Sequence, residues 1–333
     1  MTLASCTSAT TDNATDDRLN VVVTTTQLAD FTAQVGGDDI ELTGLLAPGA
    51  SAHHFDPTPN DLLKLGSADV LIVNGVGLDE FIESAIEASG FDGTIIDASE
   101  GVDLVAAREI TAESEEDQHE ADAHSHEGDN HDDDHDHDHD HGDLNPHLWT
   151  SPTFAQGMVT EIAEGLAAKD QANGEAYLER ASAYNEQLGA LDEWILAQYE
   201  RVPTETRVLV TGHDSLRYYL HDYAIAYAGS LLPSFEDNAE PSAAEIDALV
   251  AAIKQSGVRA IFVESSLSPK LAQTVAREAG VTVVDAESLY VDSLGAAGSG
   301  AETYIDATTH NTRVILEAWG AEVDSQPSTV EGE

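Results

Sequence analysis

The sequence predicts an α/β protein of two lobes, each built on a parallel sheet, with a long spine helix between them. Short apolar runs rich in β-branched residues alternate with helical patterns in residues 19–99, and the same alternation returns in residues 207–319. Strands that alternate with helices form βαβ units and therefore parallel sheets. Between the two regions, residues 152–199 are an almost unbroken run of helix-forming residues. We therefore expect two (βα)-type lobes joined by this helical segment.

The strands of the first lobe are predicted by apolar runs of the kind that a parallel sheet buries on both faces. Four such runs occur, at Leu19–Thr25, Ile40–Leu46, Asp69–Gly75 and Gly93–Ser99. Apolar residues at helical spacing predict helices at Gln27–Val35 and Leu78–Ala88. The order of these elements predicts one parallel sheet covered by helices.

The segment after the first lobe has the features of a helix start and of a helix break. Ser151 is a plausible N-cap, with Pro152 at the first helical position. Asn173-Gly174 is a turn pattern, which predicts a break between two helices. The second lobe then has predicted strands at Arg207–Gly212, Ala260–Ser265 and Val281–Ala286, and predicted helices from Ser215, at Ala243–Ser256 and at Glu302–Trp319.

The composition is strongly acidic, with 63 acidic residues against 13 basic ones and a formal net charge of −50. Such a field repels nucleic acids and anionic lipid headgroups and attracts cations. We therefore expect no nucleic-acid partner. Fifteen of the acids lie in residues 113–143; a saline habitat is the alternative explanation for the acidity of the rest. No run of 18 apolar residues occurs, so we expect no membrane-spanning helix.

The only cysteine, Cys6, excludes an intrachain disulfide. Its context, Leu3-Ala4-Ser5-Cys6, resembles the end of a bacterial lipoprotein signal, where the cysteine is lipidated and becomes the mature N-terminus. The polar tract Thr7–Asp17 has the composition of a flexible tether. This predicts an extracytoplasmic protein held at the membrane by a lipid on Cys6; a free cysteine in a chance match is the alternative.

The predicted domain limits follow from these patterns. Residues 113–143 have no apolar periodicity, which predicts a disordered insertion. The chain then divides into a lipoprotein-type tether (1–18), an N-terminal α/β lobe that contains the insertion (19–150), a linking helix region (151–201), a C-terminal α/β lobe (202–320) and a tail (321–333).

Histidines stand at three loop positions beside predicted strand or helix ends. "GASAHHFDP" follows the second predicted strand, "NPHLW" opens the long helix, and "VTGHDSL" places His213 directly after a strand. Asp292, in "LYVDSLG", follows the last predicted strand. Ligands in open α/β sheets bind beyond the carboxyl ends of the strands. A single histidine in such a place is more often structural, but three at corresponding loops together indicate a metal site.

These motifs resemble the metal-binding solute-binding proteins of bacterial ABC importers, the ZnuA/TroA-like group of zinc type (cluster A-I). The resemblance covers Leu19 to about Trp319. It rests on five motifs in the family's order: "HHFDPTPNDLLKLGSADVLIVNGVGLDEFIE", "NPHLWTSP", "VTGHDSLRYY", "AEPSAAEIDALVAAIKQSGVRAIFVESSLSPK" and "DSLGAAGSGAETYIDATTHN". It implies two lobes with a metal in the cleft between them and only modest closure around it. It also implies a membrane permease as partner, and we expect the protein to be a monomer.

Carried over onto this chain, the family's pattern implies the metal ligands His53, His147, His213 and Asp292. Of the adjacent pair, His53 rather than His54 stands two residues before the aromatic residue. His54 then has a surface role or supports a ligand, and His310 in the last predicted helix is a packing or surface residue. Asp292 is expected to ligate directly; acceptance of a hydrogen bond from a liganding histidine is the alternative.

The cargo that these ligands imply is Zn²⁺, because three neutral imidazoles and one carboxylate suit a tetrahedral ion of borderline softness. A manganese carrier of the same family is the alternative, and the resemblance implies a carboxylate at the place of His213 in such members. A zinc enzyme is a further alternative, but no His-Glu-x-x-His occurs and Asp292 would close the fourth position. A metal-buffering surface lipoprotein without a permease is the last one.

The stretch "HDDDHDHDHDHGD" (His131–Asp143) predicts an accessory zinc collector and not the tight site. With no apolar residue to offset its ordering entropy, it should bind ions weakly and reversibly. A solvated charge run without a role is the alternative. Eight histidines between Glu113 and Asp143 are the accessory candidates: His119, His124, His126, His131, His135, His137, His139 and His141.

Overall fold

The computed structural model describes residues 18–51, 53, 55–112, 144–232, 241–264 and 269–331. The N-terminal half is built on one parallel sheet in the order β2-β1-β3-β4. Its strands are β1 (Leu19–Val23), β2 (Ile40–Gly44), β3 (Val70–Val73) and β4 (Thr94–Asp97). The predicted strands of this lobe are therefore all present, and each ends a few residues earlier than expected.

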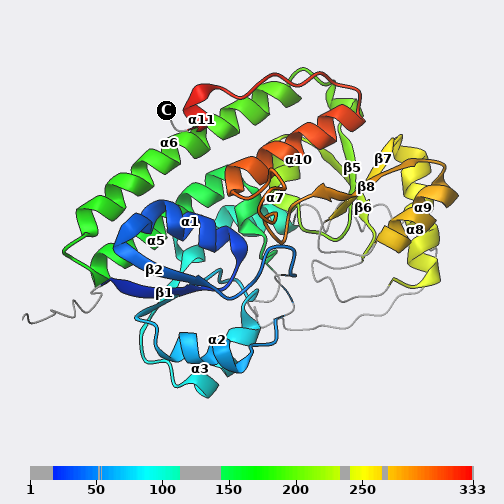
Figure 1. Cartoon of the computed structure of the whole chain (residues 1–333). Helices are drawn as coiled ribbons and strands as arrows, with labels where there is room; N and C mark the ends of the chain where they lie inside the picture. The colour runs from blue at the N-terminus through cyan, green and yellow to red at the C-terminus, as the bar shows by residue number, and fades with distance from the viewer. Residues whose placement is uncertain are drawn as a thin grey trace, which may run out of the picture.

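Helices cover both faces of this sheet, because neighbouring residues of β1 point to opposite sides. Val21 and Val23 belong to the main hydrophobic core, whereas Val22 packs in a second core with Leu65 and Ile82. Figure 1 shows helix α1 on one side of the sheet and α2 and α3 on the other. These helices are α1 (Thr26–Gly36), α2 (Pro59–Gly66) and α3 (Glu80–Ser89), and residues 104–112 are also helical.

Two helices, α5 (Pro152–Lys169) and α6 (Gly174–Tyr199), form the spine of the molecule. The Ser151 hydroxyl accepts from the backbone N–H of Phe154, so the predicted N-cap is confirmed. The break falls at Asn173, as predicted. Helix α6 is 26 residues long, which corresponds to about 39 Å. It runs from beside α1 to beside α10 (Tyr304–Ala318) and α11 (Ser328–Glu331) (Figure 1).

The C-terminal half contains two pairs of parallel strands. Strand β5 (Val208–Thr211) pairs with β6 (Ala226–Ser230), and β7 (Ala260–Glu264) pairs with β8 (Thr282–Leu289). Strands β5 and β7 are in contact, so the two pairs lie next to each other. The remaining helices are α7 (Arg217–Asp222), α8 (Ala243–Ser256) and α9 (Pro269–Ala279), and short 3₁₀ turns are η1 (Gly37–Asp39), η2 (Ala98–Gly101), η4 (Leu148–Thr150) and η5 (Thr204–Thr206).

The predicted fold class, two α/β lobes with parallel sheets, is confirmed. The sequence patterns did not predict α2, the helix at 104–112, β6, α9 or α11. Strand β6 has the sequence AYAGS, which is short and contains little of the branched apolar character that marks a buried strand. Helix α7 begins at Arg217 and not at Ser215, and the Asp214 carboxylate pairs with the Arg217 guanidinium. The predicted domain limits stay a prediction.

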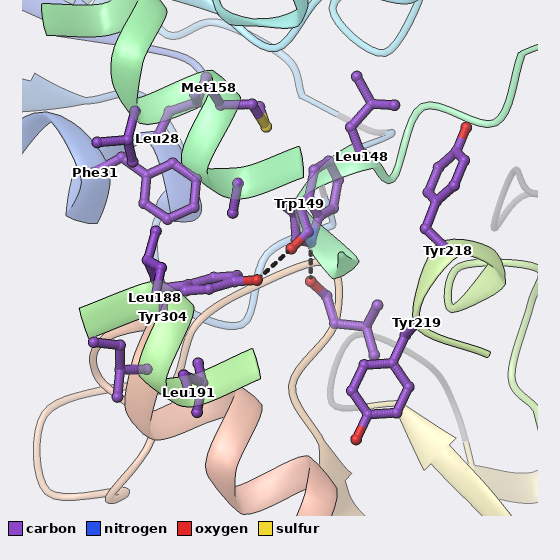
Figure 2. Close-up of a cluster of buried hydrophobic side chains, with 14 of the residues drawn as sticks. Leu28, Phe31, Leu148, Trp149, Met158, Leu188, Leu191, Tyr218, Tyr219 and Tyr304 are labelled. Atoms are coloured by element: carbon purple, nitrogen blue, oxygen red, sulfur yellow. Dashed lines mark hydrogen bonds between the residues drawn. The ribbon is translucent and has the colours of Figure 1, made fainter. Parts of the chain in front are cut away.

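The main hydrophobic core extends across both halves. It contains Phe31 of α1, Leu188 of α6, Phe262 of β7 and Tyr304 of α10. Figure 2 shows Trp149 in this core: its backbone carbonyl accepts from the Tyr304 hydroxyl at 2.7 Å, and its indole N–H donates to the Val291 carbonyl at 3.0 Å. The two halves are thus joined by packing and by hydrogen bonds as well as by the chain.

We expect Ala224→Gly to stabilise the protein. Ala224 follows α7 with a φ of 50°, and Ile225 N–H donates to the Leu220 carbonyl across it. This left-handed position favours glycine, so the change should raise the free energy of unfolding by about 1 kcal/mol. Urea unfolding measures it. The matched control is Ala251→Gly, which also changes an exposed alanine but inside α8, and should lower the same quantity by about 1 kcal/mol. Equal losses in both variants would contradict the prediction.

Candidate metal centre

Four side chains from different parts of the chain converge at one point between the halves. His53, His147, His213 and Asp292 each offer one potential ligand atom, and these atoms all lie within 4.8 Å of one another. His53 lies in the loop between β2 and α2, and His147 immediately precedes η4. His213 follows β5, and Asp292 follows β8. The structure therefore brings together all four of the predicted site residues.

The distances within the cluster are short. His147 Nε2 lies 3.0 Å from His53 Nε2 and 3.2 Å from His213 Nε2. Asp292 Oδ1 lies 3.3 Å from both His147 Nε2 and His213 Nε2. His147, His213 and Asp292 are buried, and His53 is half-buried. One half-buried member gives this otherwise enclosed cluster a solvent-facing side.

Each buried histidine is oriented through its other ring nitrogen. His147 Nδ1 lies 2.8 Å from Asn145 Oδ1, and the Asn145 amide nitrogen donates to the Asp214 carbonyl. An amide oxygen only accepts, so His147 carries a proton on Nδ1 and turns Nε2 toward the other three side chains of the cluster. Asn145 is itself fully buried. The "NPH" motif therefore supplies a histidine together with the residue that selects its tautomer.

His213 is oriented by Glu264, which sequence analysis did not identify. His213 Nδ1 lies 2.7 Å from Glu264 Oε2. The Oε1 atom of Glu264 accepts from the backbone N–H groups of Gly212 and His213 and from the Ser215 hydroxyl. Glu264 ends β7, which is in contact with β5, the strand that precedes His213. The sequence signal that could have indicated Glu264 is its place at the carboxyl end of a predicted strand, where ligands of α/β sheets bind.

The electrostatics of the cluster favour positive charge. Burial opposes an imidazolium, yet the Asp292 and Glu264 carboxylates outweigh it and raise the pKa of His213 well above its ordinary value. Burial alone would raise the pKa of Asp292, but His213 and His147 lower it well below the usual range. The two buried carboxylates, Asp292 and Glu264, thus stabilise positive charge at this point, either a proton on His213 or a bound cation that replaces it.

The arrangement suits the capture of one divalent metal ion. Imidazole nitrogen and carboxylate oxygen are ordinary ligands of zinc and of other first-row transition metals. Carboxylates and carbonyls behind ligating histidines fix their orientation and strengthen their bonds to the metal. Within the described residues, no other group of three or more such side chains has metal-binding spacing.

The remaining histidines are not part of this cluster. His310 lies on α10, edge-on to Tyr290 with ring centroids 5.3 Å apart, which agrees with the predicted packing or surface role. His221 is exposed and lies 3.3 Å from the Asp222 carboxylate. His54 and the eight histidines of residues 113–143 lie outside the described residues.

No helix in the described part of the chain is long and apolar enough to cross a bilayer.

The known proteins that are similar to this chain include some that are named for manganese binding and some that are named for zinc binding. The manganese-binding lipoprotein MntA of Halalkalibacterium halodurans is 27% identical over 94% of this chain and 93% of its own. The manganese ABC transporter substrate-binding lipoprotein PsaA of Streptococcus pneumoniae is 25% identical over 95% of this chain and 93% of its own. The periplasmic zinc-binding protein TroA of Treponema pallidum shares the fold, with a TM-score of 0.74 and 24% identity over 91% of this chain and 99% of that one.

One family model spans nearly the whole of the described protein. Its description is "ZnuA: Zinc-uptake complex component A periplasmic", and it matches residues 21–318. The match includes nearly all of the four-stranded sheet, both strand pairs of the C-terminal half, the spine and all four converging side chains. The chain therefore belongs to the ZnuA family of metal-binding, substrate-binding proteins of ABC importers.

Proposed function

We propose that this protein is an extracytoplasmic receptor that captures Zn²⁺ between its two halves and delivers it to the membrane permease of an ABC importer. Members of the family are solute-binding receptors of ABC transporters, so the protein binds and presents a cargo and is not an enzyme. The zinc-enzyme alternative is thereby excluded. The ion is a divalent metal, and its identity as zinc is the proposal.

The donor set of the cluster carries the proposal. Three imidazole nitrogens and one carboxylate oxygen suit a tetrahedral borderline cation. A tetrahedron with zinc–ligand bonds of about 2.0–2.1 Å has edges of about 3.3–3.4 Å. Four of the six distances between ligand atoms, 3.0 to 3.3 Å, lie close to these edges, and all six are within 4.8 Å. The spacing supports a single shared ion, and the predominance of nitrogen ligands supports zinc.

Manganese is the second candidate, because the similar lipoproteins MntA and PsaA are named for manganese. Manganese prefers sites that are richer in oxygen. Here the position that a carboxylate would fill in such a site is held by His213, and Glu264 stands behind it at 2.7 Å from Nδ1. Glu264 thereby orients an imidazole and leaves only one carboxylate facing the other three side chains.

The experiment that separates the two metals measures uptake, because almost any such site binds zinc more tightly than manganese in a test tube. Cells with and without the gene are supplied with radioactive zinc or manganese at limiting concentration. We expect loss of the gene to abolish high-affinity zinc uptake and to leave manganese uptake unchanged. Metal analysis of protein isolated from its own cells should find zinc; manganese in both measurements would overturn the zinc assignment.

The ligand assignment predicts a sharp difference between adjacent residues. His53→Ala should weaken zinc affinity by about 100-fold or more, as should His147→Ala and His213→Ala, because each removes one metal bond. His54→Ala should leave the affinity close to that of the wild type. Competition with a zinc chelator measures all four variants.

The matched control for these variants is His310→Ala, which removes a histidine of α10 outside the cluster. If His54→Ala lost affinity and His53→Ala did not, the register of the first motif would be off by one. A zinc-bound structure tests the fourth ligand: an Asp292 oxygen should lie about 2.0–2.2 Å from the metal. A separation above about 3 Å would give Asp292 a supporting role only.

We further propose that residues 113–143 are an accessory collector beside the tight site. The segment ends at Asp143, four residues before His147, so ions on it are held at high effective concentration near the cluster. Its alternating histidines and acids offer many weak sites in place of one cage.

Deletion of Glu113–Asp143 should leave one tight zinc site, because His53, His147, His213 and Asp292 are kept, and should remove the weak sites together with their eight histidines. Calorimetric titration counts both classes. The matched control keeps the length and the acids but replaces the eight histidines by asparagine, and it should lose the same weak sites. A folded deletion variant that lacks the tight site would refute the collector role.

Three features of the setting also belong to this proposal. Anchoring by a lipid on Cys6 is supported by the lipoprotein names of MntA and PsaA. We also propose that the protein is a monomer. The predicted limits of the tether, the lobes and the linking helix region remain part of the same proposal. Mass spectrometry of the membrane-bound form would test the lipid.

A further inference from the structure

The loop that carries Asp292 is held by residues from elsewhere in the chain. The carbonyl of Val291, one residue before Asp292, accepts two hydrogen bonds. One comes from the side-chain amide of Gln27 at 2.6 Å, and the other from the indole N–H of Trp149 at 3.0 Å. Figure 2 draws the second bond at Trp149. Gln27 belongs to α1 and Trp149 to η4, so both lie far from β8 in sequence.

The amide of Gln27 is itself held in one orientation. The Thr26 hydroxyl donates to Gln27 Oε1 at 3.1 Å and accepts from the backbone N–H of Leu294 at 2.9 Å. Gln27 Nε2 is thereby directed to the Val291 carbonyl. Both Thr26 and Gln27 are buried. The Thr26 hydroxyl thus orients the Gln27 amide, which binds the carbonyl before Asp292. The same hydroxyl also accepts from the backbone N–H of Leu294, two residues after Asp292.

A further bond connects this loop with the loop of His53. The Ser293 hydroxyl accepts from the backbone N–H of Gly49 at 2.7 Å. Ser51, two residues on, accepts from the backbone N–H of His53. The segments that carry the first and the last member of the cluster are therefore in direct contact.

The residue before Val291 is attached differently. Tyr290 exchanges two hydrogen bonds of 2.8 Å with the Asn311 side chain of α10. A cavity of about 20 Å³, room for about one water molecule, lies beside this part of the loop. Gln27, Trp149, Tyr290 and Asn311 are among the residues that line it. Strand β8 alone therefore does not set the position of Asp292.

We propose that Gln27 and Trp149 are positioning residues for Asp292, which hold its backbone from the N-terminal half and from the entry to the spine so that its carboxylate meets the three histidines. This rests on the proposed function, in which Asp292 is a metal ligand. The physical reason is cost: a flexible ligand loses conformational freedom each time an ion binds, and a held one does not. The two hydrogen bonds to the Val291 carbonyl fix the position of the adjacent Asp292 before a metal binds.

The test uses Gln27→Met and Trp149→Phe in the full chain. Methionine is close to glutamine in length but has no donor, and phenylalanine keeps a ring against His147 while removing the indole N–H. Zinc affinity is measured by chelator competition, and Co²⁺ is used as a probe because its visible absorption reports the geometry of its ligands. We expect each variant to bind zinc about 10-fold more weakly and to change the Co²⁺ spectrum.

The matched control is Tyr223→Phe, which removes a buried hydroxyl that donates to Asp192 Oδ1 at 2.7 Å, away from the cluster. It should lose stability without any change in zinc affinity or Co²⁺ spectrum. The free energy of unfolding of all three variants without metal is measured in urea. This separates a general loss of stability from a misplaced Asp292 carboxylate.

The inference is overturned if Gln27→Met and Trp149→Phe lose only stability, as Tyr223→Phe does, and keep wild-type affinity and spectrum. Failure of the proposed function would give a different result in these experiments. The wild-type protein would then show no tight site for zinc or cobalt, or His213→Ala would bind as well as the wild type, and the positioning role would fall with it.

Discussion

The contacts of Trp149 are the constraint on which the site depends. Its ring packs edge-on against His147 at 5.2 Å between centroids, and its indole N–H holds the backbone next to Asp292. Its carbonyl accepts from Tyr304 of α10 within the main core. One residue therefore connects two members of the cluster with the packing that joins the halves, and the geometry of the site is tied to the stability of the fold.

The cluster is organised by its surroundings as much as by its own four residues. Asn145 selects the tautomer of His147, and Glu264 orients His213 while it is held by three donors of the β5–α7 turn. His53, in contrast, is half-buried. The buried members are thus held in place by their surroundings, and His53 is the member of the cluster that is most open to solvent.

Much of the fold and the four converging residues could be predicted from sequence. Strands such as β3 are continuous apolar runs, and His53, His147, His213 and Asp292 stand in recognisable motifs. Their supporting residues could not be found that way. Gln27 contacts Val291 across 264 positions of the chain, and such a contact leaves no local pattern. Glu264 reads as the end of a strand until β5 is placed beside β7.

Glu264 and Asp292 together set the valence that the buried site accepts. Three neutral imidazoles and two enclosed carboxylates sum to two negative charges, so an ion of charge two gives a neutral centre. With the imidazoles neutral, a monovalent ion would leave one negative charge uncompensated in this largely buried site, and a trivalent ion would leave one positive charge. Charge balance therefore favours a divalent ion over potassium or sodium, in the same direction as the ligand preference of imidazole nitrogen.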